Sequence, residues 1–348
     1  MRAFRILAWS ALCATAAALA TPTMPSSGDD GVHVPAADRR TPDQTFLTFP
    51  EWFLVFSPAE YADMLEGDQS SDAFPFFGHV AQFWNAYGRV IGATRAYPFN
   101  GEYHTMIVVI GVSTTVEYGL KGAYETLFGR LSALTAAPNA TPEDRLATEQ
   151  ARAYVDFIRI EPWYKFDFIA PLRRLWTQTP WTGPHLVRKW ERRYLLTSEW
   201  AVKAAYAALI KRATGSTFEA PKPTTLAVVR GLPDTEDGLP GIRVLQQQGA
   251  QTLVSLPRYQ PFTEDAIALA KRSVDFDEIA GNSGAILVSL VVPVPREVDP
   301  RAPVLIRQPI VTRPGFERRV LQVPVSRLAD TLRAHAAAGD AIEHVFDY

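Results

Sequence analysis

The chain has 348 residues, of which 47% are hydrophobic and 21% are charged, and its formal net charge is −2. This composition is typical of a folded protein with one or two large cores, and it excludes a disordered chain. A net charge so close to zero favours no particular class of partner.

Residues 1–20 have the pattern of a signal peptide or an N-terminal membrane anchor. Arg2 and Arg5 precede an apolar run over residues 6–20, which ends in the small residues of Ala18-Leu19-Ala20. Because this run is shorter than the roughly 20 residues of a spanning helix, we expect cleavage rather than permanent insertion. Cys13 is the only cysteine, so cleavage would leave a chain without disulfides or a thiol nucleophile. We expect export to the periplasm, or to the periplasmic face of the inner membrane, of a bacterial envelope.

Three further segments follow along the chain. Residues 21–44 contain four prolines and two glycines, which predicts a disordered tether. Residues 45–217 have helical periodicity and predict a helical domain. Near residues 218–223 the pattern changes, and residues 224–348 alternate with period two between turn signals. The expected class is therefore α+β.

The stretch over residues 103–128 has three interpretations: a membrane segment, a buried core helix, or the wall of a site around Glu117. Its uncharged part, from Thr105 to Val116, is 12 residues long. That length is too short to cross a bilayer core of about 30 Å. Gly111 and its small neighbours permit a close helix contact. We predict a buried core helix.

Glu117 is the principal candidate for a catalytic residue. It follows 12 uncharged positions, so burial would raise its pKa and make it a general acid or base. The alternative is a structural ion pair with a basic residue of a neighbouring helix. Its candidate partners in a pocket are Glu102, His104, Glu161 and Asp167.

Motifs for metals and common cofactors are missing from the sequence. There is no HExxH, GxGxxG, GxxxxGK[ST] or GxSxG pattern, which disfavours zinc proteases, dinucleotide enzymes, P-loop NTPases and α/β-hydrolases. A metal would require distant residues to converge inside a helical bundle, without the ExxH pairs of di-iron bundles. We therefore predict no metal site and name no cofactor. The residues that would have to converge are His79, His104, Glu117, Asp156 and Glu161.

Tryptophan and basic residues gather between residues 152 and 212. Five of the eight tryptophans lie there, together with twelve Lys and Arg against five Asp and Glu, a local balance of 12 − 5 = +7. Such a mixture suits an anionic membrane surface, where indoles lie at headgroup depth. Single-stranded nucleic acid would also suit it, but an exported protein rarely meets nucleic acid. The alternative is a helical core of tryptophans with a solvated basic face. The predicted membrane contacts are Trp163, Trp176, Trp181, Trp190, Arg173, Arg174, Arg188, Lys189, Arg192 and Arg193.

The C-terminal segment predicts a ferredoxin-like α+β sandwich with an inserted hairpin. Its expected order is strand, helix, strands, helix, strand, with hairpins at the turns over residues 281–284 and 313–315. No internal repeat is visible. This fold serves many functions, so it predicts none, although a protein partner for this domain stays open.

The sequence thus favours a non-enzymatic envelope protein that associates with the membrane surface through a Trp/Arg-rich helical domain. The alternative is an enzyme or small-ligand-binding protein with a carboxylate-containing pocket in that domain.

Overall fold

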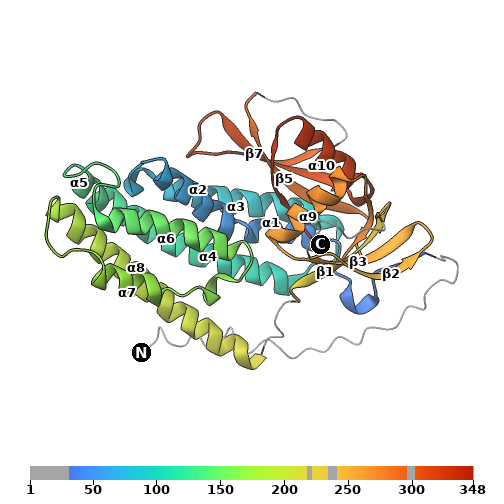
Figure 1. Cartoon of the computed structure of the whole chain (residues 1–348), viewed down its shortest axis with the longest axis horizontal. Helices are drawn as coiled ribbons and strands as arrows, with labels where there is room; N and C mark the ends of the chain where they lie inside the picture. Colours follow the sequence, from blue (N-terminus) through green and yellow to red (C-terminus); the bar gives the residue numbers. More distant parts are fainter. Residues whose placement is uncertain (1–30, 218–221, 234–240, 296–301, 348) are drawn as a thin grey trace. The chain divides into compact units, whose positions relative to one another are not determined.

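A computed structural model describes residues 31–217, 222–233, 241–295 and 302–347 (Figure 1). The predicted signal peptide and residues 21–30 of the predicted tether lie outside these ranges. Residues Val32–Tyr348 form one compact unit, with a helical region followed by antiparallel sheets. The change from helix to strand falls between residues 217 and 224, where the sequence pattern predicts it.

The helical region contains eight α-helices among the described residues. A π-helical turn over Glu125–Gly129 continues α4 into α5. Thr141 caps α6 through its hydroxyl, which accepts a hydrogen bond from the backbone N–H of Asp144, and Pro142 opens the helix. The helices are α1 (Gln44–Glu51), α2 (Phe53–Glu66), α3 (Phe76–Ala93), α4 (Gly101–Tyr124), α5 (Arg130–Ala133), α6 (Pro142–Ile158), α7 (Ile169–Thr177) and α8 (Leu186–Thr217).

Helix α4 covers most of the stretch for which the sequence predicts a buried core helix, and that prediction is only half right. One face, with Ile107, Gly111 and Tyr118, is buried. A Cβ at Gly111 would lie 2.3 Å from the ring of Phe83, so the glycine is what allows α3 and α4 to approach. The opposite face carries valines and leucines that remain exposed, including Leu120 at 70%.

The C-terminal strands form two four-stranded antiparallel sheets, so the structure does not confirm a single ferredoxin-like sandwich. The orders are β2-β3-β1-β4 and β6-β7-β5-β8. Strands β6 and β7 pair, as the sequence predicts. Strands β4 and β5, which the sequence predicts to form a hairpin, belong to different sheets. The strands are β1 (Thr224–Arg230), β2 (Arg243–Gln248), β3 (Gln251–Pro257), β4 (Asp275–Ile279), β5 (Ala285–Pro293), β6 (Val304–Pro309), β7 (Phe316–Pro324) and β8 (Ala341–Val345).

The two sheets repeat one topology, although no repeat is visible in the sequence. Each half has three strands, a helix and a last strand that pairs with the first; the helices are α9 (Gln260–Lys271) and α10 (Leu328–Ala337). The bulge between first and last strands also recurs, after Val228 in β1 and after Ser289 in β5. One hydrophobic core joins both sheets and both helices. The C-terminal region is therefore a pair of topologically equivalent halves.

The second sheet packs its other face against the helical region. The backbone N–H of Leu287 in β5 donates a hydrogen bond to the hydroxyl of Thr45 in α1. Phe46, Phe49 and Phe346 belong to the same hydrophobic cluster. The helical and sheet regions therefore share buried surface.

Residues 32–43 lie against the first sheet, so the prediction of a tether does not hold for them. Val32 and Val34 are buried beside Val228 and Leu253, and the backbone N–H of Val34 donates to Glu278. Alternating valines in this short segment cover an apolar sheet face, which overrides its proline-rich composition.

Candidate functional site

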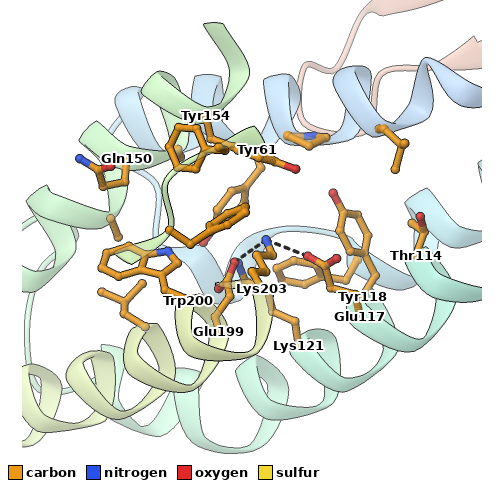
Figure 2. Close-up of a pocket in the computed structure, with 18 of the residues that line it drawn as sticks. Tyr61, Thr114, Glu117, Tyr118, Lys121, Gln150, Tyr154, Glu199, Trp200 and Lys203 are labelled. Carbon is orange, nitrogen blue, oxygen red and sulfur yellow. Dashed lines mark hydrogen bonds and ion pairs between the residues drawn. The ribbon is translucent and has the colours of Figure 1, made fainter. Parts of the chain in front are cut away.

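Four charged side chains from α4 and α8 form a linked row in the wall of a cavity (Figure 2). The Lys203 ammonium lies 2.9 Å from a carboxylate oxygen of Glu117 and 2.9 Å from one of Glu199. Lys121 donates to the other oxygen of Glu199, also at 2.9 Å. Two acids and two lysines therefore neutralise one another in an alternating row.

Glu199 and Lys203 remain ionised. Burial by itself would raise the pKa of Glu199, but Lys121 and Lys203 outweigh it and hold this pKa well below its usual range. Burial would lower the pKa of Lys203, but Glu117 and Glu199 raise it well above normal. Near neutral pH, Glu199 therefore stays deprotonated and Lys203 keeps its proton, so neither group exchanges a proton there.

Glu117 is not the desolvated acid that the sequence suggests. Its side chain is 43% exposed and paired with Lys203. The structure instead shows the alternative interpretation, an ion pair with a basic residue of a neighbouring helix. The sequence analysis missed Lys121, Glu199 and Lys203, although Glu117–Lys121 and Glu199–Lys203 have the i,i+4 spacing of helical ion pairs.

The cavity has a volume of about 100 Å³ and lies between α2, α4, α6 and α8, with this row in its wall. Eight of its lining residues are aromatic, and the ring nearest to each lysine is a tyrosine: Lys121 lies 4.5 Å from the centre of the Tyr61 ring, and Lys203 lies 5.5 Å from that of Tyr154. The aromatic lining residues are Phe53, Tyr61, Phe76, Tyr118, Tyr154, Phe166, Phe168 and Trp200.

The other predicted catalytic residues do not join Glu117. Glu102 and His104 lie at the start of α4, about 20 Å along the helix from Glu117 at 1.5 Å per residue. His104 is buried against Tyr87, to which it is hydrogen-bonded at 2.9 Å. Glu161 pairs with Lys165, and Asp167 accepts hydrogen bonds from the first backbone N–H groups of α7. His104, Glu161 and Asp167 therefore make structural contacts away from Glu117, and Glu102 is exposed.

The convergence that a metal would require does not occur in the part of the chain that the structure describes. There, no group of three or more His, Cys, Asp or Glu side chains is placed to hold an ion.

Four of the predicted membrane contacts point into the protein, and for these the prediction is wrong. Arg188, Lys189, Arg192 and Arg193 are each at most 3% exposed. Their partners come from earlier helices: Asp144 pairs with Arg188, Glu143 with Lys189 and Arg193, and Glu125 with Arg192. The local charge of +7 overlooked these acids because they lie outside the counted segment.

Three tryptophans of the same segment surround Arg193. Its guanidinium lies 5.4 Å from the ring centre of Trp176, 5.6 Å from that of Trp181 and 5.1 Å from that of Trp190. Alternating Trp and Arg residues therefore form intramolecular cation–π contacts. Trp181 and Trp190 still expose one side, Trp163 and Trp176 are half-buried, Arg173 is exposed, and Arg174 pairs with Glu149.

Many of the exposed large apolar side chains lie instead along α4, α5 and the outer side of α8. The two long helices are antiparallel neighbours, because Glu117 pairs with Lys203 and Glu125 with Arg192. We call this surface the α4/α8 face. Its large apolar residues, each more than 40% exposed, are Val109, Val112, Val116, Leu120, Leu127, Phe128, Leu131 and Leu134 on the α4 side, and Val187, Trp190, Tyr194, Val202 and Leu209 on α8.

Within the described ranges, none of the helices combines the length and apolarity that crossing a bilayer requires. Comparison of the chain with protein-family models, curated proteins and solved structures finds no match.

Proposed function

We propose that this chain is a non-enzymatic, exported envelope protein that associates with a membrane surface through the α4/α8 face. The observation that carries the proposal is the exposure of this face, where leucines and valines recur at helical spacing on two adjacent helices. Soluble monomers seldom expose many large apolar side chains together on one face. The ion pairs of Lys203 with Glu117 and of Lys121 with Glu199 hold α4 and α8 side by side, so that they present one surface.

We propose lipid as the occupant of the α4/α8 face because of the width of this face and the side chains at its edge. A helical partner seated along one seam would need a single narrow stripe, whereas two parallel stripes suit a broad surface. Tyr194 and the exposed side of Trp190 supply aromatic rings of the kind that lie at headgroup depth. Arg130, which is exposed within the α5 end of the face, could extend to lipid phosphates.

The N-terminal segment supports the same arrangement. If residues 1–20 direct export or remain as an anchor, only 11 residues separate them from Val32, where the folded body begins. A chain of that length spans at most about 40 Å. An anchored form would therefore hold the folded body close to the bilayer.

Burial of four basic residues changes the expected character of membrane binding. Each basic side chain at an anionic surface contributes about 1 kcal/mol, and four of the six predicted ones are unavailable. Apolar contact should therefore dominate, with a modest preference for anionic lipid.

Flotation with lipid vesicles tests this proposal. The full chain should float with phosphatidylglycerol-containing vesicles, should stay bound in 1 M salt for the most part, and should be released by detergent. A reporter fused after residue 31 that is active only outside the cytoplasm tests export separately. Protein that stays at the bottom of the gradient, with every vesicle composition, would refute membrane association.

The cavity favours a second function, binding of a small ligand. Its aromatic walls, its charged row and its position inside a helical bundle are typical of ligand sites. Catalysis by Glu117 has less support, because Lys203, its ion-pair partner among the described residues, holds its proton too tightly to exchange it near neutral pH.

A further inference from the structure

We propose that the cavity lined by Glu117 binds a small organic ammonium ion with an apolar body. This inference rests on the second function above, ligand binding in the cavity, and adds the chemical class of the ligand.

The walls of the cavity are already in contact with ammonium groups. Lys121 lies over Tyr61, and Lys203 lies over Tyr154 and, at 6.0 Å, over Phe168. The faces of aromatic rings carry partial negative charge, and each such contact stabilises a cation by about 0.5–2 kcal/mol. Rings that accept the protein's own ammonium groups are also suited to a trimethylammonium or primary ammonium group of a ligand.

An anion would find both lysines occupied. Glu199 accepts hydrogen bonds from Lys121 and Lys203, and ring faces, which repel anions, cover another side of each lysine. Glu117 differs, because it has one ion-pair partner among the described residues and is 43% exposed. The accessible charge at the cavity is therefore a carboxylate.

Neutral polar groups in the walls can also accept hydrogen bonds from the N–H groups of a primary ammonium ligand, or from a hydroxyl of a trimethylammonium ligand. The hydroxyls of Tyr61 and Tyr154 and the side-chain amide of Gln150 line the cavity, and no hydrogen bond joins them to other described residues. Burial raises the pKa of Tyr154, so its hydroxyl stays neutral. These groups could solvate an ammonium ion without adding charge.

The size of the cavity limits the ligand. One water needs about 10–15 Å³ of such space, so about 100 Å³ holds roughly seven to ten water-sized groups. Choline is of this size. A free amine and the headgroup of a choline lipid share this chemistry.

Calorimetric titration of the full-length protein with choline and with its uncharged isostere 3,3-dimethyl-1-butanol tests the inference. Choline should bind at least tenfold more tightly, and acetate should not bind. Equal binding of the isostere would overturn the assignment to cations while leaving a ligand site. Failure of choline, the isostere and acetate to bind would overturn the ligand site as well.

Variants locate the binding and identify its source. Glu117→Gln should weaken choline binding at least tenfold, whereas Glu102→Gln, at the far end of the same helix, should not. Tyr154→Leu keeps apolar volume and should weaken choline but not the isostere; unchanged choline binding in both cavity variants overturns the proposal. Dihexanoyl phosphatidylcholine binding more tightly than choline would indicate a lipid headgroup, and the reverse a free amine.

Discussion

Replacement of Leu120 by Ala separates membrane contact from folding. Complete burial of a leucine side chain is worth about 1.5–3 kcal/mol. Leu120 is 70% exposed in the folded chain, so about 1–2 kcal/mol remains to be gained when it enters lipid. Because alanine has the higher helix propensity and little packing is lost, the free energy of unfolding should hardly change.

The expected result is vesicle affinity lowered roughly 5- to 30-fold, with an unchanged melting temperature. Leu131 is 64% exposed and lies about 16 Å further along, so Leu131→Ala should add a similar loss in the double variant. Affinity is measured by titrating vesicles against a fixed concentration of the full chain, and stability by thermal unfolding.

Leu245→Ala is the matched control, because Leu245 is 44% exposed on β2, outside the α4/α8 face. It should leave vesicle affinity unchanged. If Leu120→Ala binds vesicles as tightly as the unaltered chain, or if Leu245→Ala weakens binding as much, lipid contact by the α4/α8 face is refuted.

Three further predictions concern stability. Glu143→Gln should lower the free energy of unfolding in denaturant by about 3–5 kcal/mol, because it leaves Lys189 and Arg193 buried without their carboxylate. Glu149→Gln removes an exposed ion pair and should lower it by less than about 1 kcal/mol. Equal losses in the two variants would contradict this account. Gly111→Val should lower the melting temperature, because its side chain would overlap the ring of Phe83; an unchanged melting temperature would show that α3 and α4 do not approach as described. Burial raises the pKa of Glu51 to about 7. The folded chain therefore keeps a proton on Glu51 that the unfolded chain releases near pH 4.5, and the folded state loses stability as the pH rises through 7. Glu51→Gln should therefore gain stability relative to the unaltered chain, by at most about 3 kcal/mol, between pH 4 and pH 8; a constant difference across that range would refute the shifted pKa.

Local patterns in the sequence determined the positions of several elements. The capping threonine and proline at residues 141–142 set the start of α6, because capping depends on residues within one turn. The boundary between helices and strands near residue 220 followed from a change of hydrophobic period. Gly111 already marked a close helix contact, since a missing side chain is visible without knowing the partner.

The candidate site depended on contacts that a local pattern cannot show. Glu117 was visible as an isolated acid, but Lys203, 86 positions later, decides its charge environment. The Trp/Arg segment resembled a membrane surface because its acids, among them Glu125 and Glu143, belong to other helices. Only the fold brings these charges together and places them inside.

The tertiary structure also decided the pairing of strands and the exposed side of α4. Strands β4 and β5 are adjacent in sequence and carry a turn between them, but each finds a better partner elsewhere, in a different sheet. The apolar residues of α4 fit a buried helix equally well, because periodicity records where side chains point and not whether another element covers them. The sequence alone therefore established a helical region followed by a region of strands. The neighbours of each segment, and so the cavity and the α4/α8 face, followed only from the packing of distant parts of the chain.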